Sequence, residues 1–163
     1  KDALENEIDD NRFVLIHENF RYIKRFLRFH GVTKVNGILA DLGVSSHQFD
    51  VAERGFSTRF DADLDMRMNT SDALSAYEVI NDYDEEKLSS VLFEYGELRN
   101  SRALAKEIVL ARIQGEIKTS FRLKEVLQRF LPKSKEHKIL AQIFQAIRIE
   151  VNQEIEVLKE FLL

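Results

Sequence analysis

The stretch from Gly37 to Asn69, GILADLGVSSHQFDVAERGFSTRFDADLDMRMN, contains the strongest functional signal in this chain. It opens with the apolar run Ile38-Leu39-Ala40, which is typical of a strand buried in a parallel sheet. The sequence then turns polar at Asp41 and continues as a long segment rich in Ser, Gln, Arg, Asp and Gly. In open α/β sheets, ligands bind just beyond the carboxyl ends of the strands. The stretch therefore predicts a binding site that includes Asp41.

The residues before this stretch predict a second strand and a connecting helix. A nearly continuous apolar run over residues 12–17 predicts a short strand, and residues 36–42 predict another. Between them, apolar residues at helical spacing predict a helix over residues 22–29 that ends at Gly31. A strand, a helix and a strand in this order form a crossover unit, which implies that the two strands are parallel.

The chain after residue 70 has the periodicity of helices only. Capping residues predict where four helices begin, at Thr70, Ser71 or Asp72, at Asp84, at Asn100 or Ser101, and at Ser120. A last helical pattern runs from about residue 137 to residue 163, with a break near Asn152. The predicted class is therefore α/β, with a small strand-containing part and a larger helical part.

Composition limits the classes of function. The chain has 163 residues, 44% hydrophobic content, no Cys and a formal net charge of −4. The absence of Cys excludes disulfides, thiolate nucleophiles and Cys-based zinc sites. No signal-peptide pattern or membrane-length apolar run is present, which is compatible with a cytoplasmic protein. Residues 99–138 nevertheless carry eleven basic and four acidic side chains, so they form either an RNA-facing surface or a solvated helical face.

The order of motifs in the chain resembles the MraW/RsmH family of methyltransferases. The matching blocks are Asp41 to Ser46, Gln48, Asp50, Ala52 to Ser57 and Leu64 to Met68, and a further block, FQAIRIEVN, spans Phe144 to Asn152. The resemblance implies transfer of a methyl group from S-adenosylmethionine to the exocyclic N4 of a cytidine in small-subunit ribosomal RNA. Within the last block, Arg148 or Glu150 is a candidate for holding two domains together.

The resemblance also implies roles for individual residues. The expected cofactor-binding residues are Phe20, Asp41 and Gln48, and the expected catalytic residues are Asp41, Ser45, Ser46 and Asp65. The expected RNA-binding residues are Arg54, Phe56 and Arg67 in the motif segment and, from the charge of the basic block, Arg99, Arg102 and Lys106. Structural alternatives stay open, because Phe20 and Phe56 are also compatible with core packing, and Asp65 and Arg67 with a structural ion pair. The four His residues have no spacing typical of a metal site, and no metal is expected.

The family implies a Rossmann-like methyltransferase domain that carries an all-helical insertion. The expected division is residues 1–69 for part of the Rossmann-like domain, residues 70–152 for a helical insertion that binds RNA, and residues 153–163 for a helix that returns to the first domain. The six glycines are scattered, so the Gly-rich cofactor loop is missing from this sequence. The chain therefore resembles an internal fragment of a family member, without that loop and without the last strands.

Two consequences are expected of such a fragment. Two parallel strands leave open edges, which favours a homodimer or other self-association through those edges. Binding of S-adenosylmethionine by this chain alone should be weak or absent, because part of the cofactor contacts is missing. The alternative to a piece of an RNA methyltransferase is a non-catalytic RNA- or protein-binding module derived from one.

Overall fold

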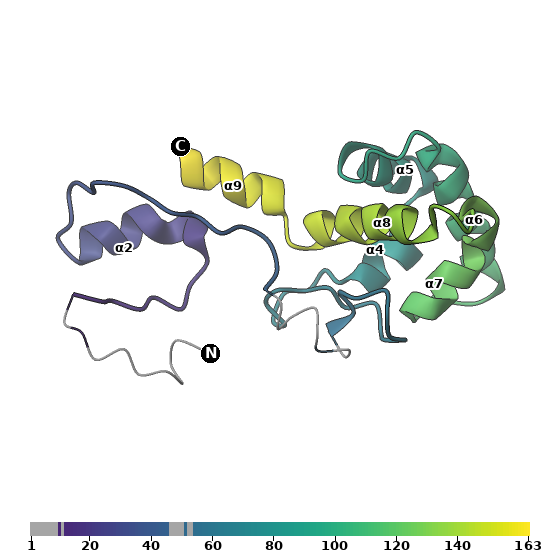
Figure 1. Cartoon of the computed structure of the whole chain (residues 1–163), viewed down its shortest axis with the longest axis horizontal. Coiled ribbons are helices and arrows are strands. Elements are labelled where there is room, and N and C mark those ends of the chain that lie inside the picture. Colours follow the sequence, from purple (N-terminus) through teal and green to yellow (C-terminus); the bar gives the residue numbers. More distant parts are fainter. Residues whose placement is uncertain (1–9, 11, 46–50, 52–53) are drawn as a thin grey trace. The chain divides into compact units, whose positions relative to one another are not determined.

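The computed structural model describes residue 10, residues 12–45, residue 51 and residues 54–163 (Figure 1). They divide into two compact units, Lys1–Asp41 with Ile155–Leu163, and Leu42–Glu154. The two units are referred to below as the first and second unit. The three-domain division expected from the sequence stays a prediction.

The first unit contains two short helical elements and the last helix of the chain. Its elements are η1 (Phe20–Tyr22), α2 (Ile23–Phe29) and most of α9 (Glu154–Leu162). Asn19 caps η1, since its side chain accepts a hydrogen bond from the Arg21 amide at 3.0 Å. The ring of Phe20 meets the ring of Phe161 edge-on, with 5.5 Å between the centroids. The helix expected over residues 22–29 is confirmed, and Gly31 follows it with a φ of 69°.

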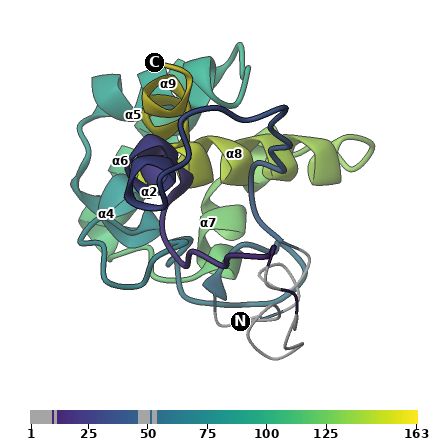
Figure 2. The same ribbon diagram turned by 90° about the vertical axis from the view of Figure 1, so that its left-hand side faces the viewer.

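The two expected strands are not formed in the structure. Residues 12–17 and 36–42 are irregular, and Figure 2 shows the segment after α2 as a trace without a strand arrow. In the described part of the chain, the β pairing is limited to one isolated antiparallel bridge, between Asp63 and Thr119. Apolar residues of the second segment are exposed, and Leu39 has 99% of its surface accessible. A strand needs a neighbour for its backbone hydrogen bonds, and apolar periodicity alone does not supply one. Self-association through strand edges therefore has no basis in the described residues.

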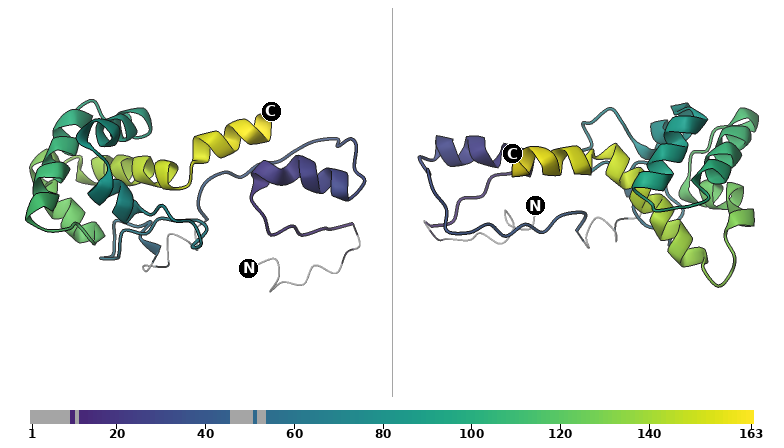
Figure 3. Two further views of the ribbon diagram at one scale, coloured as in Figure 1. Left: turned by 180° about the vertical axis from the view of Figure 1, so that it is seen from behind. Right: turned by 90° about the horizontal axis from the view of Figure 1, so that it is seen from above.

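The second unit is a helical domain preceded by a long irregular segment. Its helical elements are α4 (Ala76–Asp82), α5 (Glu85–Glu94), α6 (Ser101–Gln114), α7 (Ser120–Val126), η3 (Gln128–Phe130) and α8 (Glu136–Val151). Helices α5 and α6 pack against each other, and α8 contacts both α4 and α5 (Figure 3). Fully buried side chains such as Ile80, Leu92, Ile108 and Ile147 bring these four helices into one core.

Most of the helix boundaries predicted for the second unit are confirmed. Asp84 caps α5 by accepting from the Lys87 amide at 2.7 Å, and α6 begins after Asn100. The break expected near Asn152 separates α8 from α9. The start predicted for the first of these helices is wrong, because α4 begins at Ala76 with Ser75 as its cap. Asp72, one of the predicted caps, does not cap α4, and its side chain accepts a hydrogen bond from the Asn69 side chain at 3.0 Å.

Ser75 and Glu78 form a capping box that links the stability of the second unit to pH. Burial disfavours the charged form of Glu78, but hydrogen bonds from the Ser75 hydroxyl (2.5 Å) and amide (2.7 Å) outweigh it and lower the pKa of Glu78 below its usual value. A lowered native pKa gives stability that is present above the unfolded-state pKa and is lost as pH falls through the native value.

Replacing Glu78 by Gln is therefore expected to weaken the acid dependence of unfolding. The free energy of unfolding should fall less steeply below pH 4.5 in the variant, as measured by urea titrations at several pH values. Glu85→Gln, on the exposed first turn of α5, is the matched control and should keep the wild-type slope. Equal slopes for Glu78→Gln and the wild type would contradict the role of the capping box.

In the part of the chain that the structure describes, none of the helices has the length and apolar character needed to cross a membrane.

Candidate functional site

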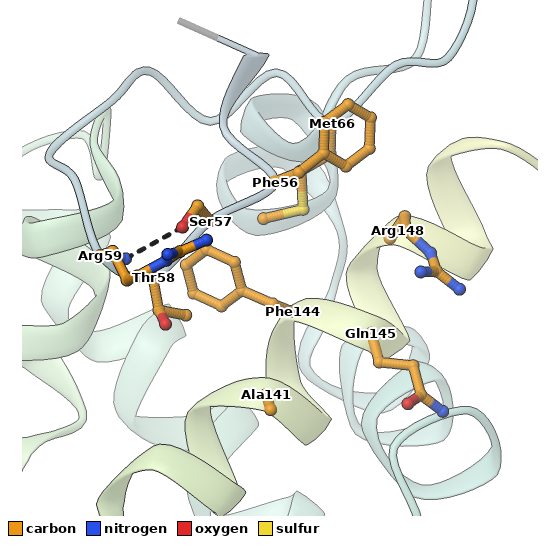
Figure 4. A pocket seen from close by; sticks show the side chains of 9 residues that line it. All are labelled: Phe56, Ser57, Thr58, Arg59, Met66, Ala141, Phe144, Gln145 and Arg148. Carbon is orange, nitrogen blue, oxygen red and sulfur yellow. Dashed lines mark hydrogen bonds between the residues drawn. The ribbon is translucent and has the colours of Figure 1, made fainter. Parts of the chain in front are cut away.

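A pocket of about 350 Å³ lies in the second unit, between the segment from Phe56 to Arg59 and helix α8. Figure 4 shows Phe144 pointing from α8 toward this segment, with Met66 close to Phe56 above it. The described residues that line the pocket are Phe56, Ser57, Thr58, Arg59, Met66, Ala141, Phe144, Gln145 and Arg148. The wall thus combines aromatic rings and a thioether with hydroxyl, amide and guanidinium groups. The two sequence blocks that meet here are about 80 residues apart in the chain.

Arg54 holds the irregular segment in place from within. Its Nη2 donates to the backbone carbonyl of Arg67 and, at 3.4 Å, to that of Met68. Its guanidinium lies 5.9 Å from the centre of the Phe56 ring. Gly55, which follows, has a φ of 69° and sits directly against the backbone of Asp63. These contacts fold residues 54–68 back on themselves, so that Phe56 and Met66 reach the same pocket.

Asp65 and Arg67 form an ion pair, which was one of the two alternatives left open by the sequence. Nε of Arg67 donates to Oδ1 of Asp65 at 2.5 Å, and Nη1 donates to the carbonyl of Asp72 at 2.8 Å. The hydrogen bond from Arg67 to Asp65 raises the pKa of the guanidinium. The pair braces the turn that leads into α4, where the backbone carbonyl of Asp65 accepts from the amide of Ala76 at 2.8 Å. The catalytic role of Asp65 and the RNA-binding role of Arg67 stay predictions.

Asn152 joins the end of α8 to the irregular segment. Its Nδ2 donates to the carbonyl of Met66 at 2.8 Å, while its Oδ1 accepts from the amide of Met68 at 2.6 Å. The side-chain amide therefore pairs with the backbone much as a neighbouring strand would. It also fixes Met66, which has a positive φ of 57° and is fully buried in the pocket wall. The hydrogen bonds of Asn152 thus fix the position of the segment around Met66 relative to helix α8, and these two elements form opposite walls of the pocket.

Substitution of Asn152 is expected to destabilise the second unit. Asn152→Ala should lower the free energy of unfolding by about 2 kcal/mol, because it leaves two partly buried backbone groups without this partner. Asn152→Asp should cost at least as much, since a carboxylate has no donor for the carbonyl of Met66. Urea unfolding followed by circular dichroism measures both.

Asn100→Ala is the matched control for this measurement. Asn100 precedes α6 and its side chain makes no capping hydrogen bond, so a change below about 0.5 kcal/mol is expected. An Asn152→Ala protein as stable as the Asn100→Ala protein would show that the amide does not clamp the segment.

Arg148 connects the pocket to two other parts of the second unit. Its Nε and Nη2 donate to the two carboxylate oxygens of Glu154 at 2.7 and 3.2 Å, which fixes the guanidinium plane. A Cβ placed on Gly43 would lie 4.0 Å from Nη2, so the segment after Asp41 passes beside this side chain. Glu150, two residues further, instead accepts from the Tyr83 hydroxyl at 2.7 Å. Burial and this hydrogen bond raise the pKa of Tyr83.

The residues predicted for cofactor binding and catalysis are distributed over both units. Phe20 and Asp41 belong to the first unit, where Phe20 keeps 39% of its surface accessible and Asp41 is exposed. Ser45 is exposed and belongs to the second unit. Ser46 and Gln48 lie outside the described residues. Among the described residues, no group of three or more His, Cys, Asp or Glu side chains could hold a metal ion.

The residues predicted for RNA binding occupy two places in the second unit. Arg54, Phe56 and Arg67 belong to the segment beside the pocket. Arg102 and Lys106 are exposed on the first half of α6, and Arg99 is exposed just before this helix. Arg99 and Arg102 share a groove with the acidic residues of α5, Glu85, Glu86 and Glu94. These carboxylates oppose the attraction of this groove for phosphate, whereas Lys106 does not line it.

Among the pocket residues, Ala141 has no role in the sequence-based prediction, and Met66, Phe144 and Gln145 enter it only as parts of the motif blocks. Thr58 and Arg59 enter it only within the stretch from Arg54 to Phe60, whose side chains are candidates for contact with the RNA backbone or a flipped base. The signal that singles them out is their position within or next to the two blocks quoted above. The sequence does not show that these blocks meet, because that depends on how α8 packs.

A family model described as "MraW methylase family" matches residues 1–163, and the chain belongs to this family.

Curated relatives agree with this assignment. The chain is 66% identical over 163 residues to a protein of Christiangramia forsetii named "Ribosomal RNA small subunit methyltransferase H". It is 65% identical to the protein of the same name from Flavobacterium johnsoniae and 51% identical to that of Bacteroides thetaiotaomicron, over 162 residues each. These matches cover 99–100% of the chain but 53–54% of the relatives. The chain thus spans about half the length of the curated relatives it matches.

Proposed function

We propose that the full-length gene product transfers a methyl group from S-adenosylmethionine to N4 of a cytidine in small-subunit ribosomal RNA, in the cytoplasm. The observation that carries this proposal is the family match over all 163 residues, together with the names of the relatives. The convergence of two family blocks on one pocket adds support, because residues that are shared for function are expected to meet in space.

The proposed chemistry sets clear demands on the protein. The exocyclic amine of cytosine is a poor nucleophile, since its lone pair is delocalised into the ring. As N4 gains the methyl group it must lose a proton, so an acceptor has to lie close to the amine. Acceptors aimed at the amine also localise its lone pair. The carboxylate of Asp41 and the hydroxyls of Ser45 and Ser46 are our candidates for these roles, with Asp65 as a further carboxylate nearby in the sequence.

The residues assigned to the cofactor are chemically suited to it. S-adenosylmethionine supplies a methyl group that is activated by a sulfonium charge. Phe20 presents an accessible apolar ring suited to adenine, and Asp41 presents an exposed carboxylate suited to hydroxyl or amine donors. Gln48 completes the assigned set with an amide. We place these residues in a Rossmann-like domain, of which this chain carries a part.

The proposed function is tested with the full-length gene product, labelled S-adenosylmethionine and small-subunit RNA or small subunits. Digestion to nucleosides followed by mass spectrometry should show N4-methylcytidine. A methyl group on another atom would refute the N4 assignment. RNA binding without any methylation would favour the alternative, a non-catalytic RNA-binding module.

The chain alone is expected to bind the cofactor weakly or not at all. Calorimetric titration of S-adenosylmethionine should give a clear heat of binding with the full-length gene product and little or none with residues 1–163. Binding costs the same loss of ligand freedom whether all or only some of the protein contacts are present. The affinity for the cofactor therefore falls steeply when some of these contacts are missing. Equal affinities for the two proteins would refute this expectation and would place the essential contacts within these 163 residues.

A further inference from the structure

We propose that the pocket between residues 56–59 and α8 holds one unstacked nucleobase of the RNA, from a nucleotide that flanks the methylated cytidine. This inference rests on the proposed function, because it takes RNA as the substrate. It adds a recognition subsite that is built entirely within the second unit.

The size and the walls of the pocket suit a flat aromatic ligand. Its volume of about 350 Å³ accommodates a nucleobase with its sugar. Phe56 and Phe144 contribute aromatic rings, and Met66 contributes a polarisable thioether. Both Phe residues are about 95% buried, with 4% and 5% of their surfaces accessible, so the rings are held by the core before a ligand arrives. Contact with aromatic side chains is a usual way in which proteins bind bases of single-stranded RNA, and here a base would meet only the small accessible part of each ring.

Polar groups at the rim suit the rest of a nucleotide. Gln145, at the exposed edge of α8, has an amide that offers both a donor and an acceptor for a base edge. Its Nε2 donates to the carbonyl of Tyr95 at 3.2 Å, which leaves Oε1 as an acceptor. Thr58 and Ser57 add hydroxyl groups to the same wall (Figure 4).

Positive charge at the rim favours the phosphate of the same nucleotide. The side chains of Arg59 and Arg148 both line the pocket, and none of its lining residues in the described part of the chain is a carboxylate. Glu154 engages Nε and Nη2 of Arg148, so the ion pair orients the guanidinium while Nη1 is not used by it. A guanidinium held in this way loses little freedom when it meets a phosphate oxygen.

The pocket favours a flanking base over the methylated cytidine itself. Among the described residues, none of the candidates for activating the amine lines it, since Asp41, Ser45 and Asp65 are all absent from its walls. The acceptor base has to reach those groups, whereas a neighbouring nucleotide needs only stacking and a phosphate contact. Separate binding of a neighbour also helps to extract the target from its stack.

Filling the pocket tests this inference without removing any core side chain. Ala141 is exposed on α8 and lines the pocket, so Ala141→Leu adds bulk inside it. Ala103→Leu makes the same change at an exposed position of α6 outside the pocket. The probe is a fluorescent single-stranded RNA of eight nucleotides, whose anisotropy is followed as residues 1–163 are added. We expect Ala141→Leu to weaken RNA binding at least about fivefold and Ala103→Leu to leave it unchanged.

A second variant tests the charge at the rim. Arg148→Gln should weaken RNA binding. It should also reduce the slope of log K against log salt concentration by about one, because one phosphate contact is lost. Circular dichroism of each variant checks that the fold is kept. If Ala141→Leu binds RNA like Ala103→Leu, the pocket is not a nucleobase subsite and the inference is overturned.

The full-length gene product separates this inference from the proposed function. If both hold, Ala141→Leu should raise KM for RNA while kcat changes little, since the cytidine amine is activated elsewhere. Wild-type methyl transfer with an unaltered KM in Ala141→Leu would overturn the subsite and leave the function standing. RNA binding that needs the pocket, but without methyl transfer by the wild type, would overturn the function and keep the subsite.

Discussion

Replacing Asp41 by Ala in the full-length gene product is expected to lower the rate of methyl transfer by about 10²- to 10⁴-fold. The carboxylate is the candidate acceptor for the N4 proton or for a cofactor hydroxyl, and alanine offers neither. Because Asp41 is exposed in the structure, its loss should change the free energy of unfolding by less than about 0.5 kcal/mol. Single-turnover methylation assays and urea unfolding measure the two effects separately.

A matched control and a second substitution sharpen the Asp41 experiment. Asp82→Ala removes another exposed carboxylate, at the end of α4, and should leave methyl transfer unchanged. Asp41→Asn keeps an acceptor but loses the negative charge, so an intermediate rate would favour orientation of the amine over proton removal. Full activity of Asp41→Ala would exclude this residue from the mechanism.

Replacing Gly55 by Ala is expected to have the largest effect on stability. A Cβ at this position would lie 2.4 Å from the carbonyl oxygen of Asp63 and 3.1 Å from the amide nitrogen of Asp65. Both atoms belong to the backbone, so the clash is not relieved by a side-chain rotation. The φ of 69° adds a cost that only glycine avoids. We expect the free energy of unfolding to fall by about 3 kcal/mol or more, as measured by urea titration of residues 1–163.

Gly115 provides the comparison within the same unit. It also has a positive φ, of 159°, but nothing lies within 4 Å of a Cβ placed on it. Gly115→Ala should therefore cost only about 1 kcal/mol, and a much larger loss of stability in Gly55→Ala would reflect mainly the clash with the backbone of Asp63. If the two variants were equally stable, residues 54–68 would not be folded back as the structure has them. In the full-length gene product, Gly55→Ala should also weaken RNA binding, because Phe56 and Met66 would leave the pocket wall.

Local sequence signals predicted most of the helices of the second unit. Asp84 predicts a cap because Asp is a favoured residue immediately before an apolar helical pattern, and the structure has its carboxylate accepting from the Lys87 amide. The break at Asn152 was recognised because a fresh amphipathic pattern starts at Glu154. The cap of α4 was misplaced because Thr70, Ser71, Asp72 and Ser75 are all capping residues. Only Ser75 is followed at the right spacing by the Glu that completes a capping box.

Strands proved harder to predict than helices. The apolar runs over residues 12–17 and 36–42 have strand-like composition, yet both are irregular in the described structure. A helix satisfies its backbone hydrogen bonds within one segment, whereas a strand depends on another segment that the local pattern does not identify. The Rossmann-like arrangement is accordingly a proposal for the full-length gene product.

The amino-acid sequence by itself determined the family, the predominantly helical character of the chain after about residue 70 and the motif blocks that contain most of the pocket residues. Only the tertiary structure decided that Phe56 and Met66 share a pocket with Phe144 and Arg148, and that Asn152 fixes that pocket. Helix capping and hydrophobic periodicity depend on residues that are close together in the sequence, so they can be predicted from the sequence alone. The pocket depends on packing and on side-chain hydrogen bonds between residues more than 80 positions apart, and these form only when the helical core brings the two segments together.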